Sequence, residues 1–70
     1  MTHLRDAIVD FTKVIQFAPD APNAYYNRGV VHSDLMNYHE ALKDLQIALK
    51  LKHPAAQSAI DIIRGQLESD

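Results

Sequence analysis

The sequence contains no cysteine, and this absence excludes several kinds of site at once. Without thiols the chain has no disulfide, no thiolate metal site and no cysteine nucleophile, which is compatible with a reducing compartment. Glycine is also scarce, with 2 residues among 70, and neither belongs to a phosphate-binding glycine loop. The composition therefore excludes cysteine-based catalytic and metal sites, and it provides no glycine-rich loop for binding a nucleotide phosphate.

An excess of positive charge is missing as well. The formal net charge is −2 and the isoelectric point is about 6.0, whereas a nucleic-acid-binding domain is expected to carry a basic stripe. Uninterrupted apolar runs are only a few residues long, far below the roughly 20 that a membrane-spanning helix needs. Arg5 and Asp6 stand where a signal peptide would be apolar. We expect a cytoplasmic protein that binds neither nucleic acid nor membrane.

Apolar residues make up 47% of the chain, enough for the core of one small domain near the lower size limit for unaided folding. They recur three or four positions apart, as on one face of an amphipathic helix. The first such run contains Leu4, Ala7, Ile8, Phe11, Val14 and Ile15. We expect a single all-α domain over 1–70 with about four helices: one at 3–18, a pair at 21–53 and a capping helix at 55–68.

Proline and small polar residues predict where these helices begin and end. Pro19 should terminate the first helix, because the residue before a proline avoids helical geometry. Asp20 is then a candidate N-cap for the second helix. Asn37 and Glu40 have the spacing of a capping box, which predicts a helix start at Tyr38. Gly29 lies inside the second helix at a cost of about 1 kcal/mol, which predicts that another helix crosses closely there.

The first and third helices are related by an internal repeat. When the chain is shifted by 34 residues, seven positions match in identity or apolar character. The matched pairs are Ala7 and Ala41, Ile8 and Leu42, Asp10 and Asp44, Phe11 and Leu45, Val14 and Ala48, Ile15 and Leu49, and Phe17 and Leu51. A fixed period of this length indicates stacked supersecondary units.

These residues resemble the tetratricopeptide repeat, a 34-residue antiparallel helix-turn-helix unit of α-solenoid proteins. Tyr25 and Gly29 fill the aromatic and glycine positions of its first helix, and Ala41, Leu45 and Ala48 fill the positions of its second. In the preceding half-unit the corresponding residues are Ala7, Phe11, Val14 and Pro19. The resemblance covers Asp6 to about Pro54, so the chain is expected to hold half a unit, one whole unit and a capping helix.

The sequence departs from the family pattern at four positions. Arg28 replaces a leucine, and His32 replaces an aromatic residue for which it is expected to be a half-buried substitute. His53 holds the place of the closing proline, which follows one residue later. Met36 stands in the tight turn where a glycine is common, and a left-handed conformation there would cost about 1–2 kcal/mol.

The resemblance implies a non-catalytic module that binds a peptide or partner helix in a concave groove formed by the first helices of its units. The expected groove residues are Asn23, Tyr26, Asn27, Val30, Ser33 and Asp34. Asn27 stands where the family often hydrogen-bonds a peptide backbone. The groove has no lysine, which disfavours capture of a C-terminal carboxylate. Tyr25 is expected in the core. The alternative role for Tyr26 is to shield the turn after Pro22, and the alternative for Val30 is packing between helices.

Self-assembly is a competing prediction. Leu4, Ile8, Phe11 and Ile15 form an apolar stripe on a helix with no first helix of its own unit before it, and two copies related by a two-fold axis would bury it. Domain swapping through a straightened Leu35–Asn37 turn is a variant of this hypothesis. A third hypothesis is that the chain is a fragment of a longer repeat scaffold, because it begins in the middle of a repeat unit.

Neither a cofactor nor a catalytic centre is expected. His32 and His39 belong to different helices, and no second ligand with metal-binding spacing accompanies them. Asp6 and Asp10 are four positions apart on a solvated face, without a cleft or a partner base. Metal binding and acid–base catalysis are therefore not predicted.

Overall fold

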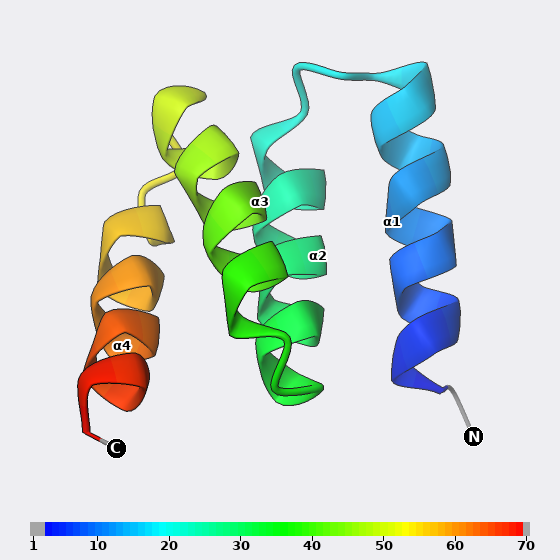
Figure 1. Cartoon of the computed structure of the whole chain (residues 1–70). Coiled ribbons are helices and arrows are strands. Elements are labelled where there is room, and N and C mark those ends of the chain that lie inside the picture. The colour runs from blue at the N-terminus through cyan, green and yellow to red at the C-terminus, as the bar shows by residue number, and fades with distance from the viewer. Residues whose placement is uncertain (1–2, 70) are drawn as a thin grey trace.

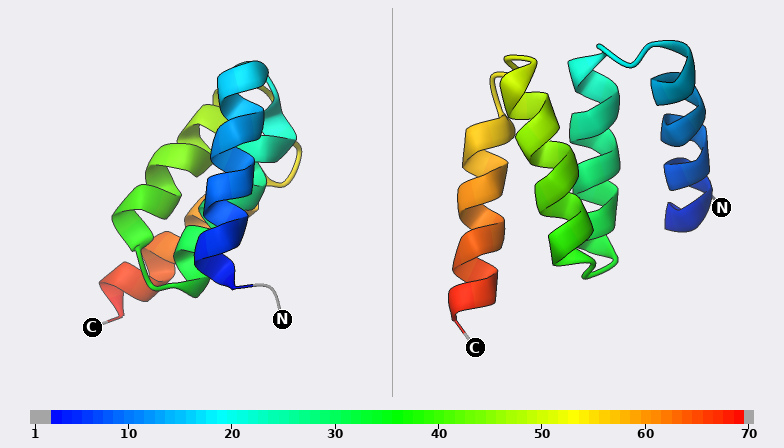
Figure 2. Two further views of the ribbon diagram at one scale, coloured as in Figure 1. Left: turned by 90° about the vertical axis from the view of Figure 1, so that its right-hand side faces the viewer. Right: turned by 45° about the horizontal axis from the view of Figure 1, so that its top comes forward.

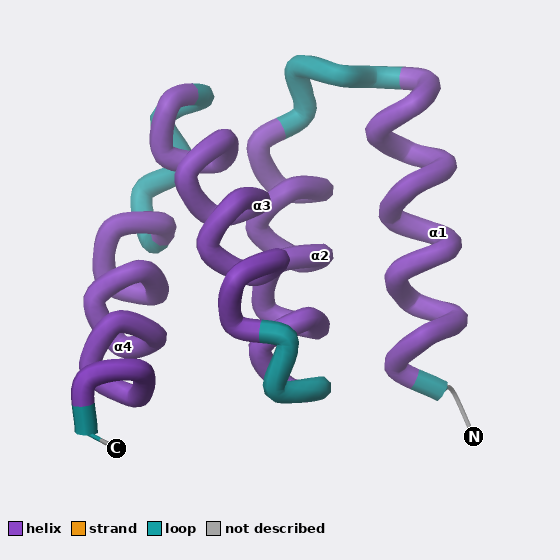
Figure 3. The backbone as a smooth tube through the Cα atoms, in the orientation of Figure 1, coloured by secondary structure: helices purple, strands orange, loops and turns teal. Residues whose placement is uncertain are grey.

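The computed structural model describes residues 3–69 and consists of four helices connected by short turns (Figures 1 and 3). The helices are α1 (Leu4–Phe17), α2 (Pro22–Asp34), α3 (Tyr38–Lys50) and α4 (Ala56–Glu68). Each runs antiparallel to the next, which confirms the predicted all-α helix-turn-helix architecture.

The helices form a thin layer in which the order in space follows the order in the chain (Figure 2). The layer measures 36 × 30 × 16 Å. The closest pair is α2 and α3, while α1 packs on α2 and α4 packs on α3 with a small contact to α2. Among the described helices, α1 therefore has one neighbour, whereas α2 is in contact with the other three.

The core lies along α2, α3 and α4. Its buried apolar residues are Ala24, Tyr25, Ala41, Leu45, Ala48, Ala56, Ile60 and Ile63. The buried residues of α3 recur at intervals of three and four, and two of the four are alanines. Because these side chains are small, α2 and α4 can pack closely on two sides of α3. In contrast, α1 has no buried residue, because it is covered from one side only.

Gly29 allows α2 to approach α3 closely. A Cβ atom at this position would lie 2.9 Å from Leu45 Cγ and 3.2 Å from the carbonyl oxygen of Ala41. Both distances are below ordinary van der Waals contact, and a backbone oxygen cannot move unless the helix moves. The predicted close crossing at Gly29 is thus confirmed.

Both helices of this pair end in Schellman motifs with a left-handed residue other than glycine. At the end of α2, Met36 has φ 63°, and the Asn37 N–H donates to the His32 carbonyl at 2.8 Å. At the end of α3, Lys52 has φ 67°, and the His53 N–H donates to the Ala48 carbonyl at 2.9 Å. The left-handed conformation considered for Met36 is present, whereas that of Lys52 was not foreseen.

The closed turn at Met36 contradicts the domain-swapping hypothesis. Besides the hydrogen bond of Asn37, the Met36 N–H donates to the Ser33 carbonyl at 2.9 Å, and α2 and α3 pack against each other within one chain. A straightened Leu35–Asn37 segment would lose these bonds together with the α2–α3 core.

The predicted helix caps are partly wrong. Ala21, not Asp20, is the N-cap of α2, because a turn in which the Ala21 N–H donates to the Ala18 carbonyl delays the helix start by one residue. Pro22 occupies the first turn as expected. Asn37 is the N-cap of α3, but neither its side chain nor that of Glu40 makes a capping hydrogen bond.

The close approach at Gly29 predicts that Gly29→Ala destabilises the fold by about 1–3 kcal/mol, despite the higher helix propensity of alanine. Gly65→Ala is the matched control, since a Cβ atom there meets nothing within 4 Å. That control should be neutral or stabilising by up to about 1 kcal/mol. Urea unfolding followed by circular dichroism measures both. Equal effects of the two substitutions would contradict the assigned role of Gly29.

The left-handed turn at Met36 predicts that Met36→Gly raises the free energy of unfolding by about 0.5–1 kcal/mol, because glycine relieves the strain at a smaller entropic cost. Lys43→Gly, at an exposed position inside α3, should lower it by about 1 kcal/mol. The same urea titration compares the two variants. A loss of stability in Met36→Gly would show that the turn is not strained.

Candidate functional site

A shallow apolar hollow of about 200 Å³ lies between α2 and α4. It is lined by Tyr26, Val30, Ser33, Leu45, Ala59, Ile62 and Ile63. Three of the six predicted groove residues, Tyr26, Val30 and Ser33, therefore line one hollow, and α4 supplies much of the opposite wall. Ligand sites are typically concave and mainly apolar with a few polar groups, and this hollow has that character.

Helical spacing explains how α2 contributes to the hollow. Tyr26, Val30 and Ser33 are separated by four and three residues, so they lie on one side of the helix, and all three are half-buried. Beneath them, Leu45 of α3 is fully buried. Across the hollow, Ile62 of α4 remains 66% exposed. Apolar surface is thus accessible inside a concavity.

Tyr26 is held in place by His53, which lies in the turn between α3 and α4. The two rings are stacked, with centroids 4.1 Å apart and an interplanar angle of 4°. His53 is itself positioned because its Nδ1 accepts a hydrogen bond from the Ala55 N–H at 3.1 Å. The histidine at the family's proline position therefore orients a residue of the hollow, which the sequence did not reveal.

The other three predicted groove residues do not line the hollow. Asn23, Asn27 and Asp34 are exposed on α2. Asn27 directly follows Tyr26 in the chain and precedes Val30 by three positions, so it lies on the adjoining part of the α2 surface. These three polar side chains are accessible to solvent near the edge of the hollow.

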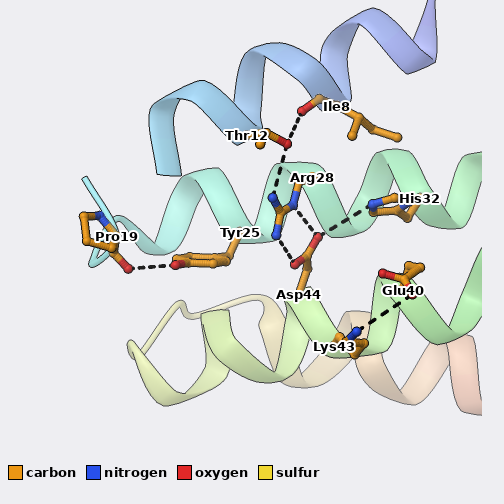
Figure 4. Close-up of polar contacts among 9 residues, drawn as sticks. All are labelled: Ile8, Thr12, Pro19, Tyr25, Arg28, His32, Glu40, Lys43 and Asp44. Atoms are coloured by element: carbon orange, nitrogen blue, oxygen red, sulfur yellow. Dashed lines mark hydrogen bonds and ion pairs between the residues drawn. The ribbon is translucent and has the colours of Figure 1, made fainter. Parts of the chain in front are cut away.

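A buried polar cluster lies at the junction of α1, α2 and α3 (Figure 4). Arg28 donates two hydrogen bonds of 2.7 Å to the two carboxylate oxygens of Asp44, which is 4% exposed. Arg28 Nη1 also donates to the Thr12 hydroxyl at 3.2 Å, and that hydroxyl donates to the Ile8 carbonyl at 2.7 Å. A single arginine thereby connects three helices.

The electrostatics of the cluster are dominated by the arginine–aspartate pair. The hydrogen bond to Asp44 raises the pKa of Arg28 above its usual value, while partial burial opposes this effect. His32 Nε2 lies 4.0 Å from Asp44 Oδ2, and its buried Nδ1 has no hydrogen-bond partner in the described chain. His32 is half-buried, as expected for a residue in an aromatic position.

Tyr25 completes the α1–α2 junction on the other side of Arg28. Its hydroxyl donates to the Pro19 carbonyl at 2.9 Å, which ties the loop before α2 to the core. The Arg28 guanidinium carbon lies 5.9 Å from the Tyr25 ring centroid, within the range of a cation–π contact. Tyr25 is buried, so its predicted role in the core is confirmed.

The apolar stripe predicted for self-association lies partly against α2. Ile8, Phe11 and Ile15 are half-buried, and Ile15 packs on the cluster that contains Tyr25, whereas Leu4 is exposed. The stripe is therefore only partly accessible, because α2 of the next unit packs on α1 and contacts Ile15. Self-association through the stripe stays a prediction.

Residues 3–69 were compared with the requirements of a metal cluster and of a membrane-spanning helix. That range contains no group of three or more histidine, cysteine, aspartate or glutamate side chains able to hold a metal ion. None of its helices combines the length and the hydropathy that a bilayer crossing requires. His32 lies in the polar cluster, His39 is exposed on α3, and Asp6 and Asp10 are both exposed.

Antiparallel helix pairs in chain order, with a glycine at their closest approach, define a helical-repeat protein. Residues 22–53 match the family model of the tetratricopeptide repeat, and this segment is a tetratricopeptide repeat. Repeats of this family are generally protein–protein interaction modules, and no catalytic family is matched. No curated protein and no solved structure matches the chain. The resemblance inferred from sequence is confirmed over residues 22–53.

The buried pair predicts that Arg28→Leu, which restores the family's usual residue, lowers stability by about 3–5 kcal/mol, because it leaves the Asp44 carboxylate buried and unpaired. The double variant Arg28→Leu with Asp44→Ala should recover most of that loss, since neither charge remains. Urea unfolding of both variants provides the comparison. A double variant no more stable than Arg28→Leu would show that the buried charge is not the cause.

Proposed function

We propose that this chain is a non-catalytic interaction module whose hollow between α2 and α4 receives an apolar side chain of a partner protein. The observation that carries the proposal is Ile62, which is 66% exposed yet lines a concavity together with Tyr26 and Val30. Exposed apolar surface in a concavity gains the most from being covered by a ligand. The family assignment supports a protein partner in general terms.

The chemistry of the hollow suggests the kind of segment that it binds. Its apolar lining and its volume of about 200 Å³ suit one aliphatic or aromatic anchor side chain. The Ser33 hydroxyl and the neighbouring Asn27 amide offer hydrogen bonds to the main chain of the segment. Asp34 is the charged residue among the predicted groove positions, so a partner with a free carboxylate at this place would be repelled.

The hollow is also preorganised. Arg28 fixes α2 against α3 from the side opposite to the hollow, and the Tyr26–His53 stack holds one wall. A site whose side chains are ordered before binding loses less conformational entropy when the ligand binds. A short segment with a single anchor side chain is therefore expected to bind more tightly than it would to a flexible site of the same lining.

The test uses linear peptides selected from a random library on the immobilised full chain and then titrated by calorimetry. We expect the selected peptides to share an apolar anchor and to lose about tenfold in affinity or more with Ile62→Asp. Asn27→Ala should cause a smaller loss. Val9→Asp is the matched control, because Val9 is a similarly exposed apolar residue on α1.

The outcomes separate clearly. Peptides whose affinity falls with Ile62→Asp but not with Val9→Asp support the hollow as the binding site. Failure to select any peptide, or equal effects of the two substitutions, would overturn the assignment. Circular dichroism of each variant ensures that a lost interaction is not a lost fold.

A further inference from the structure

The ring of His53 is held by a hydrogen bond that only its neutral form can accept. Its Nδ1 accepts from the Ala55 N–H at 3.1 Å, and Ala55 is the N-cap of α4. In a neutral histidine one ring nitrogen carries the proton and the other accepts, so this contact assigns the proton to Nε2. In the imidazolium form both nitrogens carry protons and Nδ1 cannot accept. The contact therefore exists in one charge state of His53.

The main chain of His53 is fixed independently of its ring. The His53 N–H donates to the Ala48 carbonyl at 2.9 Å, and the His53 carbonyl accepts from the Ala56 N–H at 3.3 Å. Pro54 restricts the backbone of the residue before it. A change at Nδ1 is therefore accommodated by rotation of the side chain and not by movement of the turn.

The same ring supports one wall of the hollow between α2 and α4. His53 is stacked on Tyr26, with ring centroids 4.1 Å apart and an interplanar angle of 4°. Tyr26 also packs on the core around Leu45 and Ala48, and it lines the hollow. The orientation of a wall residue thus depends on a ring whose own orientation depends on its charge.

We infer that His53 is a pH-sensitive positioning residue of the hollow. Its neutral form holds Tyr26 in the wall, and its protonation releases Tyr26, so that an apolar side chain of a partner bound at neutral pH dissociates on acidification. This inference rests on the function proposed above, because it concerns the regulation of the same hollow. Histidine is the side chain whose charge ordinarily changes between about pH 5 and 8, which defines the range of the test.

Protonation replaces the hydrogen bond with two donors that face each other. The Ala55 N–H and the new Nδ1–H of His53 would meet across 3.1 Å, and neither could accept. Flipping the ring about its Cβ–Cγ bond would preserve the stack, but a carbon would then face the Ala55 N–H and leave it unpaired. Because His53 is half-buried, a change of rotamer brings its ring to water, which supplies acceptors for both N–H groups.

The charged and titratable groups near His53 do not compensate for a positive charge. From α2 the group in contact is the Tyr26 ring, and at the end of α3 stand Lys50 and Lys52, both exposed. The first titratable residue of α4 is Asp61, and none of the ion pairs formed within residues 3–69 includes His53. An imidazolium is attracted to the face of a tyrosine, but water weakens this attraction at a half-exposed site. The lost acceptor at Nδ1 therefore decides the outcome.

The first measurement follows the two rings without any partner. Nuclear magnetic resonance is recorded on the isotope-labelled full chain in a high-pH sample at about pH 8 and a low-pH sample at about pH 5. We expect an unprotonated Nδ1 and nuclear Overhauser contacts between His53 and Tyr26 in the high-pH sample. In the low-pH sample Nδ1 should be protonated and these contacts should be lost. A ring that stays neutral, or ring contacts that persist after protonation, would overturn the inference.

The second measurement is the affinity of N-acetyl-leucine amide, an uncharged mimic of an apolar anchor, titrated into the same samples. We expect shifts of the Val30 and Ile62 signals, which belong to the hollow. The affinity should be about tenfold lower in the low-pH sample, which corresponds to an intact wall in about a tenth of the molecules.

Variants of His53 separate its charge from its contacts. His53→Asn places an amide oxygen near the position of Nδ1 and keeps an acceptor for the Ala55 N–H at both pH values. His53→Phe keeps an aromatic ring without the acceptor. Both variants should bind the amide with an affinity that does not change between the two samples. His39→Gln, which removes an exposed histidine of α3, should retain the full pH dependence.

The outcomes distinguish this inference from the proposed function. Equal affinity of the amide in the two samples would overturn the regulation and leave the hollow as a binding site. Absence of binding in the high-pH sample would overturn the proposed function and the release of a partner, even where the rings separate. A pH dependence that survives in His53→Asn would assign the effect to another histidine, such as His32 beside Asp44, and would also overturn the inference. Circular dichroism of each sample verifies that the helices persist.

Discussion

The close contact between α2 and α3 is the interaction on which the rest of the structure depends. It requires Gly29 on one helix and Ala41 on the other, because a side chain at the glycine would overlap Leu45 and the Ala41 backbone. At this distance the guanidinium of Arg28 reaches the buried Asp44 carboxylate with two short hydrogen bonds. The pair then extends to Thr12, so the position of α1 also depends on the α2–α3 distance.

Two opposite sides of α2 have different roles. The side with Arg28 and Gly29 joins the helices through polar and close contacts, whereas the side with Tyr26 and Val30 lines the hollow with α4. A small chain gains from this division, because its stability is marginal and a site that weakened the core would be costly. Arginine in place of the family's leucine at position 28 puts a positive charge between α2 and α3, where it pairs with Asp44. The charge therefore lies away from the hollow.

The repeat period, the helix positions and the close crossing at Gly29 were predictable because they depend on local spacing and on residues of extreme size. The Arg28–Asp44 pair was not found, although Arg28 stood out as an exception to the family pattern, because a contact between residues 16 positions apart has no local signature. The contribution of Ile62 to the hollow depends on the angle at which α4 packs on α3. The error at Asp20 arose because capping depends on loop geometry as well as residue type.

The single neighbour of α1 has a consequence for the order in which the chain loses structure. Amide protons of α3 are shielded by helices on two sides, so their exchange with solvent requires the chain to open almost globally. Those of α1, which contributes no buried residue, become accessible when one interface separates. We therefore expect the protection of amide protons from exchange to increase from α1 to α3. A helix that covered α1 would slow exchange mainly in α1, where it is expected to be fastest.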